Sequence, residues 1–147
     1  MLAISKLFHI AAAVLWLGGV GFMMFALRPA AALLQPAQRL PFLAAALGRF
    51  FVVVWCAIAV LLLTGFDMLL GAGVKGAPIG WHLMAGIGIL MCLLFGHLYY
   101  GPFRRLKNAI GQADWIEAGQ RMGQIATLAT LNFALGWLAI AAVILMK

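Results

Sequence analysis

Few side chains in this sequence could bind a metal or take part in a reaction. Most of these lie near one end of long apolar runs. Five lie within one or two helical turns of the same predicted end: His9, Asp67, Met68, His82 and Met84. Imidazole nitrogen binds copper, iron and zinc, and thioether sulfur selects Cu(I). A carboxylate can bind a metal or hold an imidazole in one tautomer. The pattern predicts a transition-metal site, the alternative being interfacial histidines with Asp67 capping a helix or pairing with Lys75.

His97 is predicted to lie at a different depth in the membrane from these five residues. On an ideal helix it lies about 22 Å further along the axis than His82, so the two imidazoles cannot share a ligand sphere. Soft side chains at intermediate and inner depths would extend a ladder of ligands: Cys56, Met91 and Cys92, then Met23 with His97. The alternative is that these sulfurs only pack, as methionine and cysteine commonly do in apolar surroundings.

Glycines predict close approach between the first and third apolar segments. Gly18, Gly19 and Gly21 lie in the first, and Gly86 and Gly88 in the third. Small residues at such positions favour close helix packing. A second interpretation is a flat slot for a porphyrin, with His9 and His82 as axial ligands. Trp16, two turns from His9 on the same face, would line that slot or belong to the core.

The amino-acid composition predicts the kind of structure that must hold these residues in place. Of 147 residues, 67% are hydrophobic and 9% are charged, which is too little charge to cover a water-soluble domain. We expect an all-α integral membrane four-helix bundle in one domain, 1–147. About 20 residues at about 1.5 Å each cross a bilayer core of about 30 Å. The predicted spans are 5–27, 49–70, 80–101 and 124–146.

Arginine and proline should set the helix ends. Arg28-Pro29 is expected to stop the first span, and Gly101-Pro102 the third, because proline disrupts a helix interior. The run from Leu7 to Leu27 is too long for an ordinary signal-peptide core, so we expect the first helix to be retained.

The basic residues predict the orientation. The first and third connections and their flanks hold seven of them, and the other side holds Lys6, Lys75 and Lys147. By the positive-inside rule both termini are outside, in the periplasm of a bacterium, and the protein is a multi-pass protein of the inner membrane. Short amphipathic helices are expected in the cytoplasmic connections, at Ala30–Leu40 and Asp114–Met122.

Several function classes are excluded or disfavoured. The basic residues form no patch, which argues against nucleic acid and suits contact with the lipid bilayer. Cys56 and Cys92 lack the spacing of a zinc site or a disulfide framework. With three carboxylates and no nucleophile motif, hydrolytic catalysis is not expected. If the protein is an enzyme at all, a haem-dependent membrane oxidoreductase is the class that the residues allow.

Short motifs follow one another along nearly the whole chain. They are Lys6-Leu7-Phe8-His9-Ile10, Leu15-Trp16-Leu17-Gly18-Gly19, Ala26-Leu27-Arg28-Pro29, Gly48-Arg49-Phe50-Phe51, Thr64-Gly65, Trp81-His82 and His97-Leu98-Tyr99-Tyr100-Gly101-Pro102-Phe103-Arg104-Arg105. In this order they resemble the small single-domain members of the CopD-type copper-resistance membrane proteins. The resemblance implies copper handling at the inner membrane, with His9 and His82 as binding positions.

The first span and Trp81-His82 are also similar to the HemJ-type membrane proteins of haem biosynthesis, which bind haem b. Those proteins carry a lysine two residues after the histidine of the third helix, where this chain has Met84. A thioether at that position argues against protoporphyrinogen oxidation and moves the site toward copper.

Three hypotheses follow. In the first, His9 and His82, helped by Met84, Met68 and Asp67, bind or translocate copper, with a homo-oligomer or a periplasmic copper carrier as partner. In the second, the chain is a b-type haem protein with His9 and His82 as axial ligands, in electron transfer or an oxidase function. In the third, it is a structural or assembly subunit.

Overall fold

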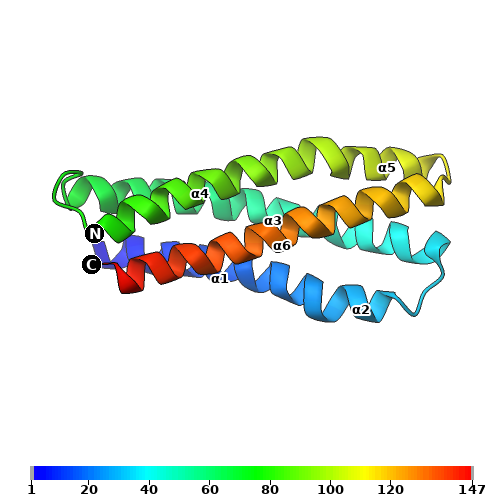
Figure 1. The fold of residues 1–147 in the computed structure, drawn as a ribbon, viewed down its shortest axis with the longest axis horizontal. Helices are drawn as coiled ribbons and strands as arrows, with labels where there is room; N and C mark the ends of the chain where they lie inside the picture. The colour runs from blue at the N-terminus through cyan, green and yellow to red at the C-terminus, as the bar shows by residue number, and fades with distance from the viewer. Residues whose placement is uncertain (1, 147) are drawn as a thin grey trace.

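Four long helical rods, each antiparallel to the one before it in the chain, form an elongated bundle (Figure 1). The structure is a computed structural model and describes residues 2–146, with the side chain of Leu2 left out. The elements in chain order are α1 (Leu2–Phe22), the π-helix η1 (Met23–Leu27), α2 (Arg28–Ala31), α3 (Pro36–Gly71), α4 (Ile79–Leu98), the π-helix η2 (Tyr99–Phe103), α5 (Arg104–Gly111) and α6 (Trp115–Leu145).

All four rods are long and apolar enough to cross a membrane. Their bounds are Ala3–Ala31, Pro36–Gly71, Ile79–Gly111 and Trp115–Leu145. In the most apolar stretch of each rod, only 17–28% of the residues are buried inside the protein, so most apolar side chains face outward. An apolar outer surface is what lipid requires, and helices satisfy every internal backbone group there. The prediction of an all-α, four-span membrane bundle is confirmed, and residues 2–146 contain no strand.

The rods pack as two pairs, α1 along α3 and α4 along α6. Where α4 meets α6, the Gly80 N–H donates to the Met146 carbonyl at 3.1 Å. A Cβ at Gly80 would lie 2.5 Å from the carbonyl oxygens of Ala142 and Met146, so the two helices approach this closely only because glycine has no side chain. This contact closes one end of the bundle.

Aromatic rings fill the core of the other half. Phe51 lies edge-on to Phe95 and to Phe103, with ring centroids 5.2 and 4.8 Å apart. Trp55 and Tyr99 extend the same cluster, with ring centroids 5.7 Å apart. Aromatic pairs prefer such edge-to-face contacts, so this half of the bundle is tightly filled.

The prolines do not end the helices as the sequence predicted. The first rod continues through Arg28-Pro29 to Ala31, and the third continues through Gly101-Pro102 to Gly111. A wide π-helical segment lies just before Pro29 and another contains Pro102. In the first of them the Arg28 N–H reaches back five residues to the Met23 carbonyl. A wider turn relieves the clash between the proline ring and the carbonyl of the preceding turn, so the helix continues.

The expected separate amphipathic helices at Ala30–Leu40 and Asp114–Met122 are also wrong in detail. The first range is split by a turn after Ala31, because α3 begins at Pro36 with proline in its first turn. The second range forms the opening turns of α6. The short amphipathic helix of that connection is α5, which buries Leu106 and Ala109 and exposes its basic residues.

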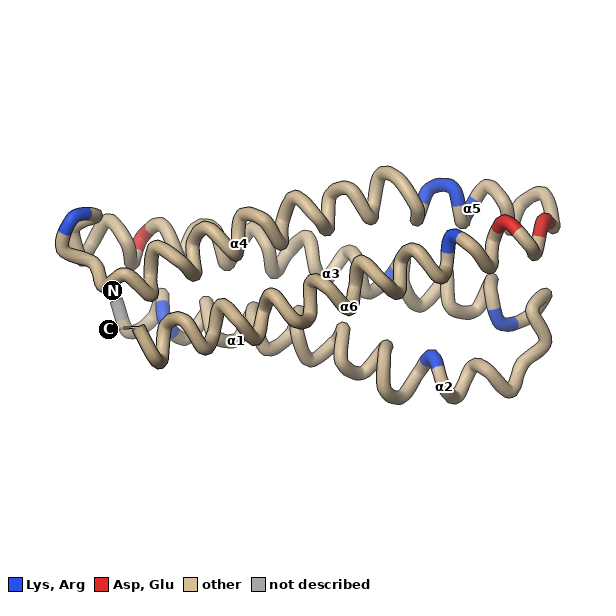
Figure 2. Tube along the Cα trace, viewed as in Figure 1, with Lys and Arg blue, Asp and Glu red and all other residues tan. Residues whose placement is uncertain are grey.

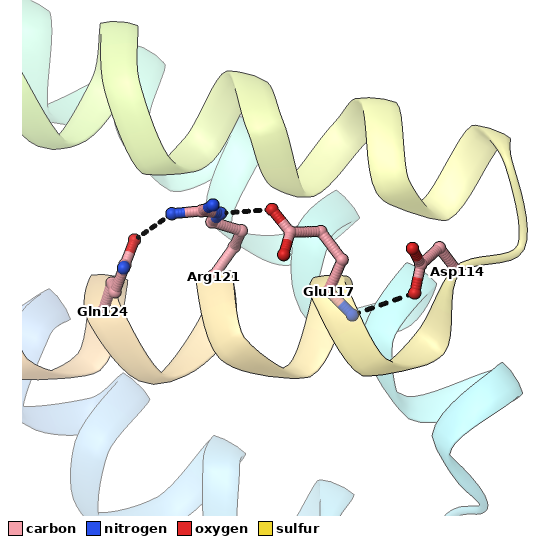
Figure 3. A network of polar contacts seen from close by, with 4 residues as sticks. All are labelled: Asp114, Glu117, Arg121 and Gln124. Atoms are coloured by element: carbon pink, nitrogen blue, oxygen red, sulfur yellow. Dashed lines mark hydrogen bonds and ion pairs between the residues drawn. The ribbon is translucent and has the colours of Figure 1, made fainter.

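The start of α6 is held by a polar network (Figure 3). Asp114 is the N-cap, and its Oδ1 accepts from the Glu117 N–H at 3.0 Å. Arg121 then joins the Glu117 carboxylate at 2.6 Å and the Gln124 Oε1 at 2.9 Å. The Asp114 contact satisfies an N–H group that the first turn of a helix otherwise leaves without a partner. The contacts of Arg121 link side chains of the next two turns.

The two ends of the bundle differ in content. Both ends of the described chain lie at one end, together with the α3–α4 loop, and we call this the terminus end (Figure 1). Lys and Arg residues gather toward the opposite end, around α2, α5 and the start of α6 (Figure 2).

Candidate metal site

A cavity of about 460 Å³ lies among the four rods in the half of the bundle nearer the terminus end. We call it the large cavity. It is lined by the first half of α1, the second half of α3, the first half of α4 and the last turns of α6, and its walls are mostly apolar. Of the residues predicted to form a site, four line it: His9, Trp16, Met68 and Met84.

His9 is half-buried and its tautomer follows from its hydrogen bonds. The His9 Nδ1 lies 2.9 Å from the Thr64 Oγ1. That hydroxyl has a single proton, which it donates to the Val60 carbonyl at 2.6 Å. Thr64 must therefore accept from His9, and Nδ1 carries the ring proton. The Nε2 of His9 keeps its lone pair and has no hydrogen-bond partner within residues 2–146, which makes it a ready metal ligand.

Gly65 gives the imidazole its room on α3. A Cβ at Gly65 would lie 3.3 Å from the His9 Cε1, closer than most side chains tolerate. The pair Thr64-Gly65 therefore does two things: the hydroxyl orients the ring and the missing side chain admits it. The sequence indicated Thr64 and Gly65 as a motif, and the structure relates both to His9.

His82 does not line the large cavity. Its side chain is exposed, and its Nδ1 and Nε2 lie 3.2 and 3.0 Å from the carbonyl oxygens of Pro78 and Val74 in the α3–α4 loop. Helical side chains lean toward the N-terminus of their helix, which directs His82 to this loop. His9 lines the large cavity and His82 does not, so the structure does not bring the two imidazoles together in that cavity.

The residues of α4 that line the large cavity follow the helical period. Trp81, Met84, Gly88 and Met91 follow the spacing of one helix face, and all line the large cavity. His82 shares its helix face with Ala85, Ile89 and Cys92, which also line the cavity, but it stands in the first turn of α4 and its ring bonds the loop before the helix instead. Met91 and Cys92, expected at a middle level, join Met84 in the cavity wall.

Asp67 and His97 lie outside the cavity. Asp67 is exposed, and its Oδ2 accepts from the Ser5 Oγ at 2.5 Å, a contact that ties the start of α1 to the end of α3. His97 is exposed in the other half of the bundle, next to Gly101. It lies fifteen residues further along α4 than His82.

The donor set of the large cavity is soft and neutral. Within residues 2–146, no three His, Cys, Asp or Glu side chains are grouped so that they could hold a metal ion. The cavity instead offers one imidazole nitrogen, from His9, the thioethers of Met68, Met84 and Met91 and the thiol of Cys92, and Lys6 is the charged residue of its lining. Such ligands suit Cu(I), whereas zinc and the hard cations take imidazole, thiolate or oxygen.

One comparison with known proteins identifies a relative. The family model CopD, described as copper resistance protein D, matches residues 44–146. No curated protein and no solved structure matches the chain at a significant level. The matched range covers α4, α5, α6 and α3 from residue 44 onward, and it begins after α1 and α2.

Proposed function

This chain belongs to the CopD (copper resistance protein D) family of membrane proteins, and on that premise we propose that it binds Cu(I) as cargo in the large cavity. His9 would supply the nitrogen ligand through Nε2, and Met68 and Met84 would supply sulfur from α3 and α4. The observation that carries the proposal is the His9 tautomer, because Thr64 leaves the Nε2 lone pair free and His9 lines the same cavity as Met68 and Met84.

The surroundings of this site favour a monovalent, soft cation. A charged ion is costly inside a membrane protein unless its ligands replace water. Thioether sulfur and neutral imidazole do so for Cu(I) without requiring a carboxylate, in agreement with the exposed position of Asp67. In this proposal Asp67 and His82 hold the elements around the cavity, and His97 is not a ligand.

The charge distribution supports an orientation. Basic residues gather at the end opposite the termini, and the positive-inside rule assigns such an end to the cytoplasm. We infer that the protein lies in a bacterial inner membrane with both termini in the periplasm. The large cavity would then receive copper from the periplasmic side, from a separate carrier protein. Translocation would call for a second copy or a partner, because four helices enclose little space.

The test is Cu(I) binding by the detergent-purified protein under ascorbate, measured by competition with a chromogenic chelator. We expect one high-affinity equivalent that His9→Ala loses and His82→Ala keeps. His82 is the matched control because it lies at the same end of the bundle and outside the cavity. Equal loss in both variants would restore the two-histidine site and contradict the proposal.

The same preparation tests the haem alternative. A bis-histidine haem needs both imidazoles on one iron, and His82 is turned to the α3–α4 loop. We therefore expect no Soret band that shifts on dithionite reduction. A haem band that disappears in His9→Ala would overturn the assignment of copper as the cargo.

A further inference from the structure

The large cavity has room for far more than a metal ion. Its volume is about 460 Å³, whereas the share of liquid volume of one water molecule is about 30 Å³, and a bare metal ion is no larger. Pockets of about 300–1,000 Å³ with mostly apolar walls and a few polar groups are typical of sites for organic ligands. A copper ion on His9 would therefore leave most of this space to another molecule.

The depth of the large cavity matches one leaflet of a bilayer. Its α1 wall extends from Lys6 to Leu17, which is about 16 Å at about 1.5 Å per residue. The apolar core of a bilayer is about 30 Å thick, so one leaflet contributes about 15 Å. Asn132 is buried near the inner end of the cavity. Its Nδ2 donates to the Met91 carbonyl at 3.3 Å, and its Oδ1 has no partner among the described residues, so the apolar path ends at a polar group.

The large cavity opens sideways between α3 and α4. Phe66 on α3 and Ile89 on α4 both line it, and their side chains are also 57% and 50% exposed. Side chains that line a cavity and lie on the outer surface as well mark its mouth. The rods pack as α1 with α3 and α4 with α6, so α3 and α4 touch little along their length. In a bilayer this mouth faces lipid acyl chains rather than water.

Lys6 supplies a positive charge at the outer end of the large cavity. Its side chain is exposed and forms no ion pair within residues 2–146. The carboxylate of Asp67 bonds Ser5 and lies outside the lining. Lys6 stands in the second turn of α1, at the depth where the phosphates of phospholipids lie when the terminus end meets the membrane surface. A basic residue at that depth attracts anionic headgroups.

We propose that an anionic phospholipid occupies the large cavity, with one acyl chain along the apolar walls and its phosphate at Lys6. The lateral mouth and the depth of one leaflet fit the chain, and the charge at the outer end fits the headgroup. The proposal goes beyond copper binding and is compatible with it. A Cu(I) ion on His9 would share with Lys6 a cavity whose described lining has no carboxylate, and like charges repel strongly where the dielectric constant is low. A lipid phosphate on Lys6 offsets that charge.

The test compares two glycines of α4. Gly88 lines the large cavity and Gly86 does not, and an added side chain has open space at both. Native mass spectrometry of the detergent-purified chain with phosphatidylglycerol should show one retained lipid in the wild-type chain and in Gly86→Leu, and none in Gly88→Leu. Lys6→Gln should weaken lipid binding about fivefold, which is the contribution of one basic residue at a membrane surface. Lys75→Gln is the control, because Lys75 lies in the α3–α4 loop at the same end and outside the lining.

Tryptophan fluorescence in vesicles gives a second measurement that leaves the cavity wall unchanged. The vesicles contain phosphatidylcholine and phosphatidylglycerol in equal parts, and only the phosphatidylglycerol carries brominated acyl chains, which quench tryptophan. Trp16 lines the large cavity and is 4% exposed, so lipid outside the bundle does not touch it. We expect Trp16 to be quenched, measured as the quenching that Trp16→Phe removes. Gly88→Leu should abolish this quenching and Gly86→Leu should retain it.

The outcomes separate this proposal from copper binding. Equal lipid retention in the two glycine variants overturns the proposal, and so does a Trp16 that brominated chains do not quench. Unchanged phosphatidylglycerol binding in Lys6→Gln also overturns it, because the headgroup would then not be held by this charge. The test contains no copper, so each of these results leaves the His9 site standing. Conversely, a chain that binds no Cu(I) can still retain the lipid.

Discussion

Replacing Thr64 by valine tests the central geometric feature of the His9 site. Valine has nearly the shape of threonine and lacks only the hydroxyl, so the packing between α1 and α3 is kept. In the wild-type chain this hydroxyl accepts the His9 Nδ1–H at 2.9 Å and donates to the Val60 carbonyl at 2.6 Å. The variant leaves a half-buried ring N–H without its partner.

The expected loss of Cu(I) affinity in Thr64→Val follows from the free energy that an unpaired N–H group costs. A buried donor left unsatisfied costs about 1–3 kcal/mol. The ring can avoid that cost by rotating or by moving its proton to Nε2, and either change removes the lone pair from the cavity. Because about 1.4 kcal/mol is a factor of ten in affinity, we expect the Cu(I) affinity of Thr64→Val to fall about 5- to 150-fold. Losses of about 10- to 100-fold are typical when the partner of a metal-bound histidine is removed.

Two assays read this prediction. Chelator competition gives the Cu(I) affinity, and nitrogen NMR of labelled histidine gives the tautomer of His9 before copper is added. The wild-type ring should carry its proton on Nδ1, and Thr64→Ser, which keeps the hydroxyl, should bind copper as the wild-type chain does. An unchanged affinity in Thr64→Val, or a wild-type ring protonated on Nε2, would refute the reasoning.

Three further predictions concern the frame around the site. Gly80→Ala should destabilise the protein by about 1–3 kcal/mol in thermal unfolding in detergent, because its Cβ would meet the backbone of α6; Gly86→Ala, where the space is open, should not. Asp114→Ala should cost about 1 kcal/mol through loss of the α6 N-cap, and Asp114→Asn should retain most of it; equal effects would contradict the capping role. His82→Ala should speed hydrogen exchange in the α3–α4 loop, where its ring contacts two carbonyls, and unchanged exchange would show that these contacts hold nothing.

Much of the fold was predictable from residue types and order. Apolar runs long enough to cross a bilayer can form only helices there, because each backbone group must be paired within its own segment. The four spans follow from this constraint. Asp114 as the N-cap follows equally from local chemistry, since its carboxylate bonds a backbone N–H three residues ahead.

Part of the candidate site was predictable too. His9, Met68 and Met84 lie at matched depths in their spans, and depth can be counted along a helix. They do line one cavity. Depth says nothing about rotation around the helix axis, and the two histidines were paired on depth alone.

Packing between the rods decided the rest. Which face of α4 turns inward depends on its contact with α6, and that rotation carries Trp81 and Met84 to the cavity. The ring of His82 lies at the loop because it bonds two loop carbonyls there. The free Nε2 of His9 depends on Thr64, 55 residues away in the chain. The unpaired oxygen of Asn132 depends on the backbone of α4. All three features depend on contacts between different helices. The order of residues specifies only which side chains lie along each helix.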